Sequence, residues 1–212
     1  MLRMLIFDFD GTLVDSMPTF AQIMQTFLDE QHIPYGDNLL NIITPLGYPG
    51  IARYFAELGV QMSEEEIYRI LDQRAVDAYT HRVPAKEHVI STLETLRSRG
   101  FSLNVLTASP HSLLDPCLKR NGIFDLFTNV WSCEDFGTTK ADPRIYEMAA
   151  QRMGKAVNEV WFLDDNLDAD TTAVKAGMKV CGVYDDSSAD CEEQIRAVAH
   201  AYIHDFTELL SF

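Results

Sequence analysis

Two aspartates stand at the end of an apolar run near the N-terminus, in the segment Met4–Thr12. Side chains two residues apart in an extended segment point to the same face, so we expect Asp8 and Asp10 to share one. Two like charges at a strand end are costly unless a cation or a proton lies between them. The pattern predicts a cation site with a carboxylate available for chemistry, although a solvated turn is the simpler alternative.

Other polar residues follow later strand-like runs. Strands are expected at Met4–Phe9, Ser102–Leu106, Asn129–Ser132, Val160–Leu163, Lys179–Val183 and Ala201–Ile203. Apolar residues with helical spacing lie between most of them, at Ala85–Arg99, His111–Asn121, Pro143–Met153 and Ala169–Ala176. This alternation predicts a doubly wound, parallel α/β sheet with right-handed crossovers. Because ligands of such sheets bind at the carboxyl ends of the strands, the polar residues found there are the candidates for binding.

Residues 17–83 interrupt the alternation and carry helical patterns instead. Helices are expected at Thr19–Gln31, Ile51–Leu58 and Glu64–Tyr79. Ser63 and Glu66 have the spacing of a capping box at the start of the third helix. We therefore expect residues 17–83 to form an α-helical cap, inserted into an α/β catalytic core made of residues 1–16 and 84–212.

Composition excludes several classes of protein. The 212 residues, 47% of them hydrophobic, suffice for a core domain and a small inserted one. The net charge of −15 argues against binding nucleic acid. The four cysteines form no Cys-x-x-Cys pair and suit a reducing compartment. With neither a signal-peptide pattern nor an apolar run near 18 residues, we expect a cytoplasmic protein without a membrane partner. Its oligomeric state has no signature in the sequence.

The chain resembles the haloacid dehalogenase-like (HAD) hydrolase superfamily in four segments that occur in the family's order. These segments are Asp8–Ser16, Leu106–Pro110, Thr139–Tyr146 and Trp161–Asn166. More narrowly, it resembles the helical-cap branch that includes phosphoglycolate phosphatase and β-phosphoglucomutase. The resemblance implies a Rossmann-like HAD core and a Mg²⁺-dependent phosphatase. Such an enzyme hydrolyses a small phosphorylated metabolite, a phosphomonoester, through an aspartyl-phosphate intermediate.

The resemblance assigns the chemical steps to the first motif. Asp8 is predicted to be the nucleophile and to bind Mg²⁺ through its carboxylate. Asp10 is predicted to protonate the leaving alcohol and then to activate water, and to bind the metal through its backbone carbonyl. Gly11 allows the tight turn that follows, and Thr12 is expected to hold that turn by a hydrogen bond.

The second and third motifs are predicted to bind the phosphoryl group. The Thr107 hydroxyl would hold a phosphoryl oxygen, with the backbone amides of Ala108 and Ser109 as further donors near a helix N-terminus. A threonine at a strand end commonly only caps a helix, and here Ser109 is the better candidate for that cap. Lys140 is predicted to offset the negative charge of the phosphoryl group and of Asp8.

The fourth motif supplies the remaining metal ligands. Asp165 is predicted to bind Mg²⁺ directly and Asp164 either directly or through water, since Mg²⁺ takes oxygen ligands and keeps several waters. Many relatives carry an aspartate four residues after the ligand, where this chain has Ala169. Its neighbours Asp168 and Asp170 preserve the acidity, and capping of the following helix is the simpler role for both.

Substrate recognition is assigned to the cap, where Arg53 is the candidate contact and solvation is its alternative. A sugar phosphomutase would share all four motifs, but Gly50 stands where mutases of this branch carry an arginine for a second phosphate. A dehalogenase needs no carboxyl group at Asp10 and no metal. A non-catalytic module of the same fold would be expected to have lost a motif residue. Phosphoglycolate, sugar phosphates and nucleoside monophosphates all remain open as substrates.

Overall fold

The computed structural model describes residues 4–211, which divide into two compact units. One unit, called here the α/β unit, comprises the chain up to Asp15 and again from Val83 onward. The other, the helical unit, comprises Ser16–Arg82. The assignment of these units as catalytic core and cap remains a prediction. Across residues 4–211 we find no helix with both the length and the apolar character of a membrane span.

The α/β unit is built on a six-stranded sheet in the order β3-β2-β1-β4-β5-β6, with every neighbouring pair parallel. The strands are β1 (Met4–Phe7), β2 (Ser102–Thr107), β3 (Asn129–Ser132), β4 (Val160–Asp164), β5 (Lys179–Val183) and β6 (Ala201–Ile203). All residues of β1 are buried, as expected for a central strand covered on both faces. The predicted parallel α/β sheet is thus confirmed, with β1 ending two residues earlier than expected.

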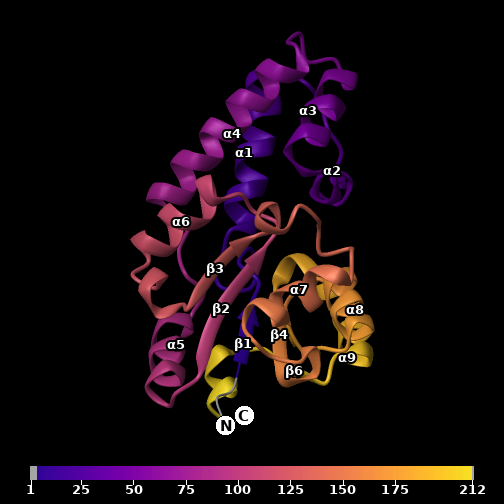
Figure 1. Ribbon diagram of the computed structural model, residues 1–212. Coiled ribbons are helices and arrows are strands. Elements are labelled where there is room, and N and C mark those ends of the chain that lie inside the picture. The colour runs from indigo at the N-terminus through magenta and orange to yellow at the C-terminus, as the bar shows by residue number, and fades with distance from the viewer. Residues whose placement is uncertain (1–3, 212) are drawn as a thin grey trace. The chain divides into compact units, whose positions relative to one another are not determined.

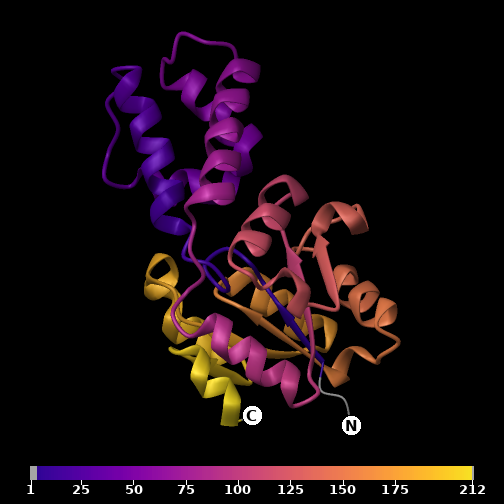
Figure 2. The same ribbon diagram turned by 90° about the vertical axis from the view of Figure 1, so that its left-hand side faces the viewer.

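Helices cover both faces of this sheet, α5 and α6 on one and α7 and α8 on the other (Figure 1). The last turn, η6 (Phe206–Ser211), lies beside α5 (Figures 1 and 2). The helices are α5 (Val89–Ser98), α6 (His111–Arg120), α7 (Arg144–Arg152), α8 (Leu167–Ala176) and α9 (Glu192–Val198). Shorter 3₁₀ turns are η2 (Phe124–Leu126), η3 (Cys133–Phe136), η4 (Val157–Glu159) and η5 (Asp186–Cys191).

The start of α5 differs from the sequence prediction. A helix was expected from Ala85, but α5 begins at Val89. Ala85 instead forms an antiparallel bridge with Val14, and the backbone N–H of Lys86 donates to the carbonyl of Leu13 at 3.0 Å. This long-range pairing keeps Ala85 and Lys86 out of the helix despite their helical spacing, and a turn at residues 87 and 88 then leads into α5.

The helical unit packs its helices around a separate apolar core. Its elements are α1 (Met17–Glu30), α2 (Leu39–Ile43), η1 (Thr44–Leu46), α3 (Gly47–Glu57) and α4 (Glu64–His81). Phe27 of α1 stacks on Phe55 of α3, with ring centroids 5.8 Å apart. The predicted capping box is present, because Ser63 and Glu66 each accept the other's backbone N–H at the start of α4.

Candidate active site

Three buried carboxylates meet at the carboxyl ends of β1 and β4. Asp8, Asp164 and Asp165 each offer an oxygen atom, and these atoms lie within 4.8 Å of one another. The sheet register explains the meeting, because Phe7 pairs with Leu163 and each strand delivers its aspartates just beyond that pair. Two of the strand ends that the sequence singled out, those of β1 and β4, are therefore brought together around one point.

Lys140 is the cation of this cluster. Its Nζ donates to the Asp8 carboxylate and, at 2.7 Å, to Oδ2 of Asp164. The ammonium group also lies 5.3 Å from the centroid of the Phe162 ring. Lys140 comes from the loop between η3 and α7, and its carbonyl accepts the hydroxyl of Tyr146 at 3.2 Å. The loop is thereby held against α7, with the lysine directed at the two aspartates.

The electrostatics of the cluster favour binding of a proton or a further cation. Burial raises the pKa of Asp8 to about 7, although Lys140 opposes the shift. Burial, with Asp164 and Asp8 as neighbours, also raises the pKa of Asp165 well above its ordinary value. Burial alone would lower the pKa of Lys140, but Asp164 and Asp8 hold it well above the usual range. One lysine thus faces three carboxylates and does not neutralise them.

The turn after β1 contacts Asp165 directly. Gly11 has a φ of +74°, and a Cβ atom built on it would lie 2.6 Å from Oδ2 of Asp165. The Thr12 hydroxyl donates to Oδ1 of the same carboxylate at 2.8 Å. Thr12 therefore ties the turn to Asp165, and a side chain at position 11 would displace that carboxylate.

Ser109 connects the first and second motifs. Its hydroxyl donates to Oδ2 of Asp10 at 2.5 Å, and its backbone N–H donates to the Thr107 hydroxyl oxygen at 3.0 Å. Pro110 occupies the N-cap position of α6, without a side-chain hydrogen bond in the described structure. The prediction that Ser109 caps α6 is wrong, because its hydroxyl is engaged with Asp10. Asp10 stands outside the three-carboxylate cluster, and Ala108 is exposed.

The two acidic neighbours of Ala169 have different environments. The N-cap of α8 is Asn166, whose side chain accepts the N–H groups of Asp168 and Ala169. Asp168 is exposed, whereas Asp170 is fully buried, and neither of its oxygens has a hydrogen-bond partner among residues 4–211. Burial raises the pKa of Asp170 to about 9. Capping of α8, the simpler role considered for Asp168 and Asp170, belongs to Asn166 instead. The i,i+3 spacing of Asp170 to Ala173 was the sequence signal for the buried face.

Comparison with known proteins shows the family of the chain. The family model described as haloacid dehalogenase-like hydrolase matches residues 5–183. The chain belongs to this family. It is 28% identical over 192 residues to a phosphoglycolate phosphatase of Pasteurella multocida, covering 85% of each chain.

Two solved structures show the same fold. One is a protein of Thermotoga maritima assigned provisionally as a β-phosphoglucomutase, with a TM-score of 0.83, 20% identity and 99% coverage of both chains. The other is a Bacillus subtilis protein assigned to the HAD hydrolases and solved bound to magnesium. Its TM-score is 0.78 at 16% identity, over 99% of this chain and 97% of that one.

The helical unit of this HAD hydrolase contains the predicted substrate contact. The Arg53 side chain on α3 is 69% exposed, and its Nε lies 3.7 Å from a carboxylate oxygen of Glu64. Its contact with substrate remains a prediction. Gly50, on the same helix, is crowded, since a Cβ atom there would lie 2.9 Å from Cβ of Leu46. A larger residue at position 50 would require Leu46 to move.

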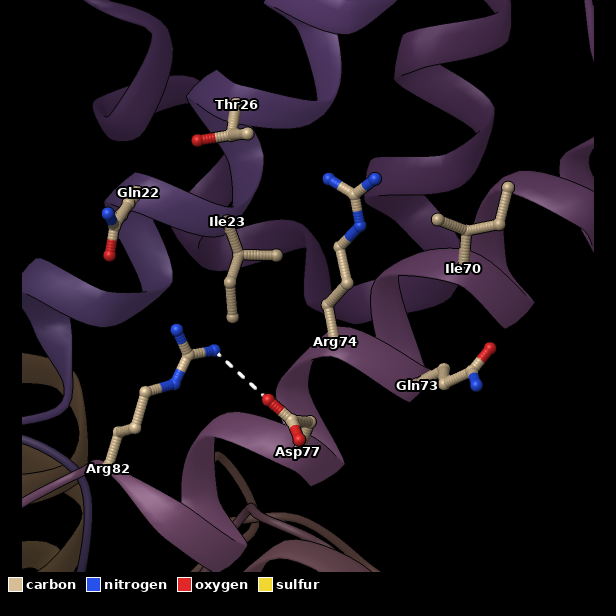
Figure 3. A pocket seen from close by; sticks show the side chains of 8 residues that line it. All are labelled: Gln22, Ile23, Thr26, Ile70, Gln73, Arg74, Asp77 and Arg82. Atoms are coloured by element: carbon tan, nitrogen blue, oxygen red, sulfur yellow. Dashed lines mark hydrogen bonds and ion pairs between the residues drawn. The ribbon is translucent and has the colours of Figure 1, made fainter.

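A groove of about 550 Å³ lies between α1 and α4 of the helical unit, and two arginines line it (Figure 3). Arg82 pairs with Asp77 at 3.3 Å, and Arg74 pairs with Glu30 at 2.5 Å. Each arginine is thus balanced by an acidic partner of the same unit. The groove contains none of the predicted site residues, so we do not place the active site there.

Proposed function

We propose that this HAD hydrolase is a Mg²⁺-dependent phosphatase that acts on a small phosphorylated metabolite through an aspartyl-phosphate intermediate. The observation that supports this most is the buried cluster of Asp8, Asp164 and Asp165, with Lys140 bonded to two of the three. A buried group of carboxylates at strand ends, with a neighbouring cation, matches the needs of phosphoryl transfer to a carboxylate.

The donor set of this cluster fits Mg²⁺. All the side-chain donors are carboxylate oxygens, which hard divalent cations prefer, and their mutual repulsion is incompletely offset by Lys140. Asp8 and Asp165 would hold the ion, with Asp164 binding directly or through water and Asp10 through its carbonyl. When bound, the ion would offset the repulsion between the Asp8 carboxylate and an incoming phosphoryl group.

The residues of the chain divide the reaction into two steps. An Asp8 oxygen attacks phosphorus as the bond to the leaving alcohol breaks, and Asp10 gives that alcohol a proton. Asp10 then takes a proton from the water that attacks the aspartyl phosphate, which releases phosphate and restores Asp8. The Ser109 bond to Asp10 can persist through both steps, because a hydroxyl can donate to a carboxylate or accept from a carboxylic acid.

Thr107 and Lys140 would bind the phosphoryl group. The Thr107 oxygen accepts the N–H of Ser109, which leaves the hydroxyl proton available for a phosphoryl oxygen. Lys140 faces the attacking carboxylate and would offset charge that develops in the transition state. The backbone amides of Ala108 and Ser109 would add donors.

A sugar phosphomutase is the second candidate, because it would form an aspartyl phosphate on Asp8 with the same motif residues. The Thermotoga maritima structure with the same fold is provisionally assigned as a β-phosphoglucomutase. Against it, an arginine at position 50 would be needed for the second phosphate, and Gly50 is crowded by Leu46. We therefore favour hydrolysis.

The test is phosphate release from a panel of phosphorylated metabolites, with Mg²⁺ and with a chelator. We expect Asp8→Asn to lower turnover by about a thousandfold or more, since it removes the nucleophile. Asp168→Asn, which changes an exposed acid on α8, is the matched control and should keep wild-type turnover. Isomerisation of a bisphosphate-primed sugar phosphate would instead favour the mutase. Folded, Mg²⁺-binding protein with neither activity would refute catalysis on these substrates.

A further inference from the structure

Lys86 is a largely buried cation outside the four motifs. Its side chain is 20% exposed, and it lies in the extended segment that pairs with residues 13 and 14 before α5 begins. Its Nζ donates to the carbonyl of Gly11 at 2.8 Å, to the carbonyl of Tyr184 at 2.6 Å and to Oδ2 of Asp185 at 3.0 Å. The three donors of the ammonium group are therefore all used.

The three acceptors come from two different strand ends. Gly11 belongs to the turn after β1, whereas Tyr184 and Asp185 follow β5. Asp185 is itself fixed, because its Oδ1 accepts the N–H and the hydroxyl of Ser187. A buried ammonium group is costly to leave without partners, so Lys86 holds these oxygens at set positions relative to one another.

The Gly11 carbonyl is part of the turn that shapes the active site. Position 11 is in close contact with the Asp165 carboxylate, and the next residue, Thr12, donates to that carboxylate. Asp10, the proposed acid and base, immediately precedes Gly11. A shift of this carbonyl would therefore move a catalytic carboxyl group on one side and a metal ligand on the other.

We infer that Lys86 is a positioning residue for the turn Asp10–Thr12, holding the Gly11 carbonyl against the end of β5. The chain thus has two lysines with separate tasks, Lys140 at the reacting carboxylates and Lys86 behind the turn. The inference rests on the proposed function for its catalytic effect, but the tether itself does not depend on that function.

The test compares Lys86→Met with a matched control, Arg120→Met. Arg120 also donates to a backbone carbonyl of the same connecting segment, but to that of Val83 and not to that of Gly11. With p-nitrophenyl phosphate and saturating Mg²⁺, we expect Lys86→Met to lower kcat by about 10- to 100-fold, with KM changed less than about threefold. Arg120→Met should stay within about twofold of wild type. Equal losses in both variants would overturn the inference.

A double variant separates positioning from simple charge balance. If Lys86 only neutralises Asp185, then Lys86→Met combined with Asp185→Asn should recover wild-type kcat, which would overturn the inference. If Lys86 acts through Gly11, the double variant should remain as slow as Lys86→Met. Asp185→Asn alone leaves Lys86 its two carbonyl acceptors and should be nearly as active as wild type.

Hydrogen exchange does not depend on catalysis, so it tests the positioning role of Lys86 separately from the proposed phosphatase function. The N–H groups of Leu13 and Val14 both donate to the carbonyl of Phe9, and these bonds close the chain around the turn Asp10–Thr12. Hydrogen exchange of these amides should be at least about tenfold faster in Lys86→Met and unchanged in Arg120→Met. Unchanged exchange in both would overturn the inference. An inactive wild type with this exchange pattern would refute the proposed function and leave the inference standing.

Discussion

Gly11→Ala is the most informative single substitution at the active site. It adds one methyl group where the backbone has a φ of +74° and where that group would lie 2.6 Å from Oδ2 and 2.9 Å from Oδ1 of Asp165. The chain offers a matched control in Gly122, whose φ is +73° and whose added Cβ would meet no atom within 4 Å. The two variants share the backbone cost and differ only in the contact.

The magnitude follows from two terms. The left-handed backbone costs an alanine about 1–2 kcal/mol at either position. At position 11, Asp165 must also retreat by nearly 1 Å to restore an ordinary contact, which breaks its 2.8 Å bond from Thr12. Breaking that bond leaves the buried Thr12 hydroxyl without this partner, which costs about 1–3 kcal/mol. We therefore expect a loss of about 2–5 kcal/mol for Gly11→Ala and about 1–2 kcal/mol for Gly122→Ala.

Denaturant unfolding in chelator measures these losses, and calorimetric titration measures Mg²⁺ binding. Because Asp165 is a proposed ligand, Gly11→Ala should weaken Mg²⁺ binding by about 10- to 100-fold, while Gly122→Ala should bind as wild type. If the two variants unfold alike and bind Mg²⁺ alike, the close approach of Gly11 to Asp165 does not shape the site and the reasoning fails.

Three further outcomes are expected. Burial raises the pKa of Asp8 to about 7 from 3.8, so the folded protein retains a proton that the unfolded chain releases. The melting temperature in chelator should then fall as pH rises from about 4 to about 7, and stabilisation by Mg²⁺ should grow over the same range; a flat profile would contradict the shift. Ser109→Ala removes the 2.5 Å bond to Asp10, and we expect kcat to drop about tenfold at nearly constant KM, whereas unchanged kcat would show that other contacts hold Asp10. Tyr146→Phe removes a hydroxyl shared by two backbone carbonyls, one of them that of Lys140, and should cost about 1–2 kcal/mol in urea unfolding. Unfolding at the wild-type midpoint would show that those carbonyls find other partners.

The sequence patterns were enough to predict that the main acidic residues lie close together. Alternation of strand and helix patterns predicted a parallel sheet, and such a sheet gathers its strand ends at one edge. Asp8, Asp164 and Asp165 were expected there and lie within 4.8 Å of one another. Lys140 was expected to offset the charge of Asp8 and contacts it. The roles of these residues in catalysis remain predictions.

Residues that depend on long-range packing were assigned less well. Ser109 has the local features of a helix cap, but its hydroxyl donates to Asp10, which lies 99 positions away in the sequence. Lys86 lies in a segment with helical spacing, but the bridge between Ala85 and Val14 keeps this part of the segment out of the helix. Capping of the following helix was the simpler role considered for Asp170, but the packing of α8 against the sheet buries this residue.

The sequence by itself determined the type and order of the strands and of most helices, though not the short helices α2 and α9, and it determined the motif residues at the strand ends. Those properties are local, because apolar periodicity and turn residues act over a few positions. Only the tertiary structure decided which side chains meet within the α/β unit. The contacts of Gly11 with Asp165, of Ser109 with Asp10 and of Lys86 with the turn after β1 join residues that lie at least 75 positions apart in the sequence. Their distances depend on how the whole core packs, which no local pattern encodes.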